Sequence, residues 1–83
     1  MKVSEDILST VSGKVVSVLC KEKKYVYEWE PLIEIETNDG ALEKIVSEIG
    51  GTVTTLLVFP GSEVKRGTNI ACIDVSVVGI ASD

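Results

Sequence analysis

Residue types that usually perform chemistry are sparse in this chain of 83 residues. It contains no histidine, and its two cysteines, Cys20 and Cys72, lie in separate apolar stretches with no base beside them. No residue spacing matches a metal site, and no glycine-rich loop precedes a helix pattern. The many glutamates fall on alternating positions, which is typical of the solvated face of a strand rather than of paired catalytic carboxylates. We therefore expect that the chain is not an enzyme.

The composition limits which class of partner and which cellular compartment are expected. Eight basic residues stand against 13 acidic ones, a net charge of −5, which disfavours nucleic acid because phosphate binding needs clustered Lys and Arg. The cysteines are expected to be reduced and to behave as small hydrophobes, with a disulfide between them as the alternative. Neither a signal peptide nor an apolar run of about eighteen residues is present, so we expect a cytoplasmic protein that does not bind a membrane.

The strongest turn signal is the segment Asn38-Asp39-Gly40. Asp-Gly suits a two-residue turn, whereas a glycine in third place suits a three-residue loop with a bulge, and the sequence does not choose between them. The segment 41–47 favours helix by residue propensity. We nevertheless predict a strand there, because seven residues between this turn and Gly50-Gly51 are too few for a stable helix. The turn is then the tip of a hairpin.

An internal repeat determines which elements surround this tip. Residues 13–36 align without gaps on residues 51–74 at a constant offset of 38, with five identities in twenty-four pairs. Ordinary residue usage would give roughly one or two identities. The matches have the spacing of strands, so the repeat predicts an all-β fold of two similar halves related by a pseudo-twofold axis. The identical pairs are Gly13/Gly51, Val15/Val53, Leu19/Leu57, Val26/Val64 and Ile35/Ile73.

The chain is short enough to form a single domain, which we place at residues 7–75. Strands are expected at 7–11, 14–20, 32–36, 41–47, 52–59 and 69–75, with the first two joined by a tight turn at Ser12-Gly13. Residues 1–6 are polar and are expected to be flexible. Residues 76–83 are expected to form a C-terminal tail or an extra edge strand.

Several of these segments together resemble the biotinyl/lipoyl attachment domain family. In the second half, residues 61–67 reproduce the family order of a Gly-Ser turn, valine, two polar residues and glycine without a shift. The resemblance implies a flattened β-barrel, or sandwich, of two four-stranded antiparallel sheets with pseudo-twofold symmetry. The other matching segments are 11–19, 26–32, 35–41, 51–53 and Ile70.

The family carries biotin or lipoate on one lysine at the tip of its central hairpin. The resemblance places Asn38, Asp39 and Gly40 at that tip, with Gly40 at the lysine position. A ligase must form an amide with a primary amine, so we expect no cofactor at this site. Lys44 is the nearest amine, but it lies some 13 Å down the returning strand at the usual strand rise, in surroundings that match neither attachment motif.

The first half departs from the family pattern at two turns. Lys23-Lys24 replaces Gly-Asp, and Trp29 replaces a glycine, which obliges Trp29 either to adopt a costly conformation or to reshape the loop. In an extended segment, alternate side chains point to the same side, so Tyr25, Tyr27 and Trp29 would form one stripe. Val26, the expected core residue, would point to the opposite side. This stripe either faces outward as a partner-binding surface or packs over the loop or under the C-terminal tail, and we favour the packed arrangement.

Two hypotheses for the function follow from the resemblance. In the first, the domain has lost its carrier lysine and is a non-catalytic protein-binding or scaffolding module, whose partner could belong to a carboxylase or a 2-oxoacid dehydrogenase-type complex. In the second, it is a genuine biotin or lipoate carrier with atypical attachment. A weaker third hypothesis is the lipoyl-like segment of membrane-fusion adaptors, although the long coiled-coil segments of those proteins are missing here.

Overall fold

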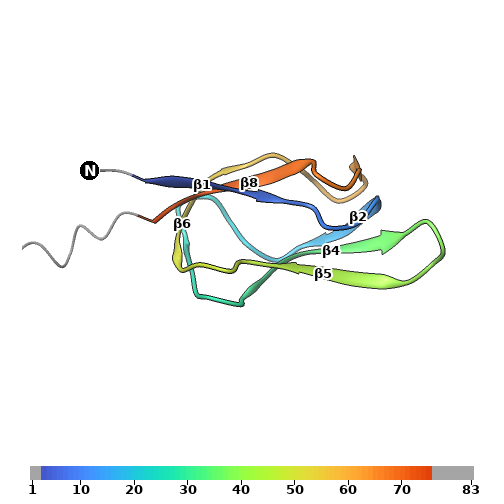
Figure 1. Cartoon of the computed structure of the whole chain (residues 1–83), viewed down its shortest axis with the longest axis horizontal. Coiled ribbons are helices and arrows are strands. Elements are labelled where there is room, and N and C mark those ends of the chain that lie inside the picture. The colour runs from blue at the N-terminus through green and yellow to red at the C-terminus, as the bar shows by residue number, and fades with distance from the viewer. Residues whose placement is uncertain (1–2, 76–83) are drawn as a thin grey trace, which may run out of the picture.

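A computed structural model of the chain describes residues 3–75. Eight strands form two four-stranded antiparallel sheets, one in the order β1-β8-β6-β3 and the other in the order β5-β4-β2-β7 (Figure 1). The all-β sandwich predicted from the sequence is confirmed. Among the described residues no helix could cross a membrane. The strands are β1 (Ser4–Leu8), β2 (Gly13–Val18), β3 (Tyr25–Val26), β4 (Pro31–Thr37), β5 (Leu42–Val46), β6 (Gly51–Leu56), β7 (Glu63–Val64) and β8 (Asn69–Asp74).

The repeat predicted from the sequence is present in the strands themselves. An offset of 38 converts β1 into β5, β2 into β6, β3 into β7, and β4 into β8 with one residue fewer at its end. Hydrogen bonds repeat in the same way: the buried Ser9 hydroxyl donates to the carbonyl of Val11, and the buried Ser47 hydroxyl donates to the carbonyl of Ile49. The two halves therefore share their turns as well as their strands.

Gly13 and Gly51 show why the repeat keeps particular residues. A Cβ added at Gly13 would lie 2.2 Å from the carbonyl oxygen of Glu36, and one added at Gly51 would lie 2.5 Å from that of Asp74. Both glycines stand where one strand crosses closely over its neighbour, and no side chain fits there.

The core consists of two apolar clusters related by the same offset. The larger cluster lies on the side of the hairpin tip, and the smaller one has five buried residues. Each of these five has its counterpart in the larger cluster: Val26 corresponds to Val64, for example, and Ile73 to Ile35. Both strands that supply these clusters, β4 and β8, bury two adjacent apolar residues where the pairing register shifts and a third one two residues later. The five core pairs are Val15/Val53, Ile35/Ile73, Val58/Cys20, Val64/Val26 and Ile70/Leu32.

The first strand differs from the sequence prediction. It begins at Ser4, inside the segment 1–6 that was expected to be flexible, and ends at Leu8. It pairs with β8 rather than with β2, so the expected tight turn at Ser12-Gly13 is wrong and this segment instead crosses from one sheet to the other. Pairing with a distant strand leaves no local signal in the sequence, which explains the error. The tail, residues 76–83, lies outside the described residues.

The strand predicted at 41–47 is confirmed as β5, which pairs with β4 along its length. Strand pairing with β4 overrides the helical propensity of the segment. The hairpin β4–β5 extends to one end of the described residues, and the start of β1 and the end of β8 lie at the other (Figure 1).

Candidate functional site

The tip of hairpin β4–β5 is a three-residue loop, Asn38-Asp39-Gly40. The amide of Thr37 donates to the carbonyl of Ala41 at 2.8 Å, and the amide of Gly40 donates to the carbonyl of Thr37 at 2.9 Å. Gly40 has a φ of +90°, as expected for glycine in the third place of such a loop. The structure thus resolves the alternative that the sequence left open.

The tip is held by side-chain hydrogen bonds. The hydroxyl of Thr37 donates to the Asp39 carboxylate and accepts from the amide of Ala41 at 3.1 Å. The bond from Thr37, together with backbone amide bonds, lowers the pKa of the fully exposed Asp39 below the ordinary aspartate value. The tip therefore presents a stable negative charge to solvent.

The three tip residues, Asn38, Asp39 and Gly40, carry no primary amine. Gly40 occupies the exposed bend, and a Cβ added there would meet no atom within 4 Å, so the space for a side chain exists although the side chain does not. Lys44 is exposed in the middle of β5, opposite Glu34 of β4. It belongs to the side of the hairpin and not to its tip.

Three exposed aromatic side chains gather at the opposite end of the domain. Tyr25, Tyr27 and Trp29 are 54%, 70% and 60% exposed, and the two tyrosine rings meet edge to face with their centroids 5.0 Å apart. Val26 between them is buried in the core. We call Tyr25, Tyr27 and Trp29 the aromatic surface. Within residues 3–75 these side chains stay more than half exposed, although a Cβ added at Gly50 would lie 2.7 Å from the Tyr25 hydroxyl. Packing under the tail concerns residues outside the described ones, so the favoured arrangement stays a prediction.

The backbone that presents the aromatic surface has an unfavourable conformation. Trp29 has a φ of +69° and Lys23 a φ of +72°, in the left-handed region that favours glycine. Their counterparts in the second half are Gly67 and Gly61, with φ of +91° and +97°. Trp29 thus keeps the left-handed turn of its counterpart Gly67 and accepts the cost of a Cβ, rather than reshaping the loop.

Hydrogen bonds to neighbouring strands fix this conformation. The amide of Trp29 donates to the carbonyl of Ser47 just beyond β5, and the amide of Lys23 donates to the carbonyl of Val53 at 2.7 Å. The contact with Ser47 lies at the end of hairpin β4–β5 that is farthest from Gly40, because Pro31 pairs with Val46 there. The tip and the aromatic surface are therefore separated by the length of the hairpin.

The two cysteines are free thiols, as expected, and no disulfide joins them. Cys20 is buried, and burial raises the pKa of its thiol. The Cys72 thiol donates to the Asp6 carboxylate at 3.2 Å, and this bond raises the pKa of Cys72. Neither thiol is activated as a nucleophile.

Two solved structures of other proteins contain a region with this fold. The crystal structure of the Kluyveromyces lactis urea carboxylase matches with a TM-score of 0.78 at 21% identity, over 86% of this chain and 6% of that one. A single-chain, multi-domain long-chain acyl-CoA carboxylase matches with a TM-score of 0.79 at 17% identity, over 94% of this chain and 8% of that one. This chain shares the fold of a small part of two carboxylases. No protein-family model and no curated protein sequence matches it.

Proposed function

We propose that this chain is a biotinyl/lipoyl-like domain that carries no prosthetic group and acts as a non-catalytic protein-binding or scaffolding module. One observation supports the loss of attachment above all: at the tip of an otherwise regular hairpin, the bend that would hold a lysine is the glycine Gly40. A swinging arm needs an amine at a fixed, exposed point, and this tip supplies the fixed point alone.

The second candidate function is a genuine carrier with atypical attachment, and Lys44 is the amine that it would use. Lys44 is exposed, which favours this candidate. Its place in the middle of β5 disfavours it, because a ligase that recognises the hairpin tip would have to accept a residue on the flank of a strand.

The aromatic surface is the proposed binding site for the partner. Large aromatic side chains are enriched among the residues that dominate binding energy, and Tyr25, Tyr27 and Trp29 are all more than half exposed. The strained backbone at Trp29 supports a functional reason for its presence, since strain tends to persist at functional sites. The partner would be a protein of a carboxylase or 2-oxoacid dehydrogenase-type complex. The likeness to two carboxylases supports the first of these.

We place the module in the cytoplasm, because two free thiols suit a reducing compartment. There it would work beside the enzymes of such a complex without taking part in the chemistry.

Co-expression with a biotin ligase tests the loss of attachment. The wild-type chain should keep its unmodified mass, whereas Gly40→Lys should gain about 226 Da, the mass of one biotinyl amide. A wild-type chain that gains this mass, and loses the gain in Lys44→Arg, would establish the carrier function instead. A Gly40→Lys chain that folds but stays unmodified would show that the tip differs from the family in shape as well as in its amine.

Affinity capture from the host tests the binding role. The immobilised wild-type domain should retain subunits of a carboxylase or 2-oxoacid dehydrogenase complex, identified by mass spectrometry, and Trp29→Ala should lose them. Phe59→Ala is the matched control, because Phe59 is an aromatic residue 67% exposed in the loop between β6 and β7, outside the aromatic surface. Equal capture by all three proteins would refute the aromatic surface as the binding site.

A further inference from the structure

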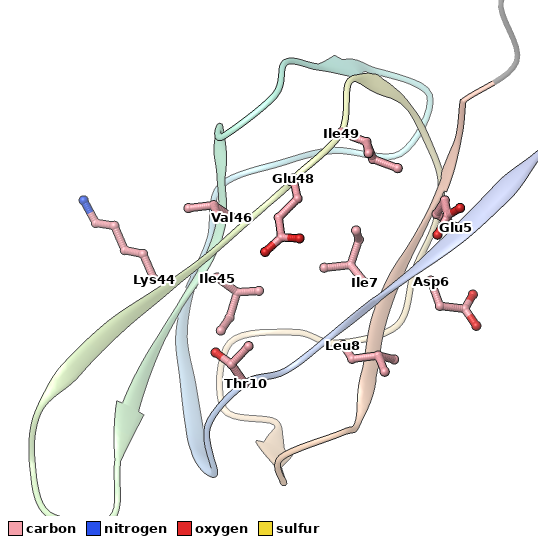
Figure 2. Close-up of a pocket in the computed structure, with 10 residues that line it drawn as sticks. All are labelled: Glu5, Asp6, Ile7, Leu8, Thr10, Lys44, Ile45, Val46, Glu48 and Ile49. Atoms are coloured by element: carbon pink, nitrogen blue, oxygen red, sulfur yellow. The ribbon is translucent and has the colours of Figure 1, made fainter.

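The strands β1 and β5 are the outer strands of the two sheets on the same side of the sandwich, and a cavity of about 350 Å³ lies between them (Figure 2). Within residues 3–75, β1 pairs with β8 alone and β5 with β4 alone. Each strand therefore has one edge whose backbone N–H and C=O groups lack a strand partner, and such an edge can pair with another extended chain.

The hydrogen bonds of each strand show which backbone groups point to the open edge. The amide of Val75 donates to the carbonyl of Val3 at 2.8 Å, and the amide of Thr37 donates to the carbonyl of Ala41 at 2.8 Å. In an antiparallel pair, every second residue bonds to the partner strand, and the residues between them direct their backbone groups to the other side. The residues that direct these groups to the open edges are Ser4, Asp6 and Leu8 of β1 and Leu42, Lys44 and Val46 of β5.

The edge residues of β1 are complementary to those of β5 in a second copy of the chain. With the two strands antiparallel and fully overlapped, Asp6 opposes Lys44, its counterpart of opposite charge at the offset of 38. Leu8 opposes Leu42, and these two side chains are 49% and 61% exposed. Figure 2 shows Asp6 and Lys44 pointing away from the cavity, so this charge pair would lie on the outer face. Such pairs directly across two strands stabilise strand pairing.

The inner faces of the same two strands oppose this association. Glu5 pairs in register with the buried Ile73, and its counterpart Glu43 pairs with the buried Ile35, so both carboxylates are on the side of the strand that faces the core. An inward-facing charge on an edge strand disfavours edge-to-edge pairing, because pairing takes the charge out of water and sets it against apolar groups. In the overlapped register, the opposed residues are Glu5 with Ile45 and Glu43 with Ile7.

We propose that β1 and β5 form a self-association site, in which β1 of one copy pairs with β5 of a second copy in the Asp6–Lys44 register, and that Glu5 and Glu43 keep the wild-type chain monomeric. β1 and β5 run in opposite directions (Figure 1), so a twofold axis along the strands allows both pairings to form at once and closes a dimer. The site uses no residue of the hairpin tip or of the aromatic surface, so it goes beyond the proposed function.

Analytical ultracentrifugation of the full chain in reducing buffer tests the association. Wild type should sediment as a monomer. Glu5→Gln with Glu43→Gln should form dimers, with a dissociation constant lower than that of wild type by about tenfold, because the carboxylates that oppose pairing are gone. Glu28→Gln with Glu63→Gln removes the same charge from exposed positions outside β1 and β5 and is the matched control, which should stay monomeric.

Exchanging the charges of Asp6 and Lys44 tests the register. In the variant with Glu5→Gln and Glu43→Gln, a further Asp6→Lys should abolish the dimer, because it sets a lysine against Lys44 of the second copy. Adding Lys44→Asp should restore the dimer with the two charges exchanged. The restored variant has the same net charge as its parent, so net charge does not account for the restoration.

Amide hydrogen exchange locates the contact. The edge amides of β1 and β5, such as those of Asp6 and Lys44, should exchange fast in the monomer and gain protection in the dimer. The amides between them, such as that of Ile7, should not change, because they already bond within their own sheet.

Four results would overturn the proposal: a variant with Glu5→Gln and Glu43→Gln that stays monomeric, a wild-type chain or a control variant that dimerises as strongly, an Asp6→Lys substitution without effect, or protection gained elsewhere. Edge amides that are protected already in the monomer would show that another part of the chain covers the edge, and would overturn it as well. None of these results bears on the missing lysine.

Discussion

The left-handed backbone at Trp29 predicts an inversion of the usual preference for alanine over glycine. Trp29→Ala and Trp29→Gly lose the same indole contacts and differ only in a Cβ. At a φ of +69°, that Cβ strains the backbone, and glycine removes the strain. The glycine variant should therefore be the more stable of the two.

The magnitude follows from two opposing terms. The left-handed conformation costs a residue with a Cβ roughly 1–2 kcal/mol. Glycine loses about 0.5–1 kcal/mol more conformational entropy on folding than alanine does. At the middle of both ranges, the difference leaves Trp29→Gly more stable than Trp29→Ala by about 0.75 kcal/mol, or about 3–6 °C in melting temperature for a domain of this size.

Tyr27 supplies the control for this comparison. It is 70% exposed in the same loop and does not have a positive φ. There the order should reverse, with Tyr27→Ala more stable than Tyr27→Gly by about 0.5–1 kcal/mol. Thermal and urea unfolding followed by circular dichroism measure all four variants, and an alanine variant as stable as the glycine variant at position 29 would refute the strain.

Three further predictions concern the pairs of groups described above. Ser47→Ala should lower the free energy of unfolding by about 1–2 kcal/mol in urea, because the carbonyl of Ile49 loses the hydrogen bond from the buried hydroxyl; an unchanged midpoint would contradict this. Asp6→Asn should speed alkylation of Cys72 at mildly alkaline pH, because the carboxylate that raises the pKa of that thiol is gone, and an unchanged rate would count against the contact. Thr37→Val should raise the pKa of Asp39 in an NMR titration. The lowered pKa of wild-type Asp39 stabilises the fold at pH values above the unfolded-state pKa, and this stabilisation is lost as the pH falls through the folded-state pKa. The acid-induced loss of stability should therefore be smaller in this variant.

The repeat made the core predictable. Residues such as Val26 and Ile35 keep an apolar side chain in both halves because each half buries them between the same two sheets. The repeat also showed that Gly13 and Gly51 are identical in the two halves. Only the structure showed why both are glycine, which is the close crossing of two strands.

Features that depend on distant pairing could not be read from the sequence. The start of β1 at Ser4 is set by its pairing with Asp74 of β8, which follows 70 positions later. That β1 and β5 are both edge strands follows from the strand order of the two sheets, which leaves no local pattern in the sequence. The parity of the aromatic residues was evident, but whether they face solvent depends on which loops surround them.

The mass of the intact protein, purified from its own host, tests the missing attachment most directly. The proposed loss of attachment, with Gly40 at the bend of the tip, predicts the mass of the unmodified chain. A molecule heavier by about 226 Da or about 188 Da, one biotinyl or one lipoyl group, would contradict it.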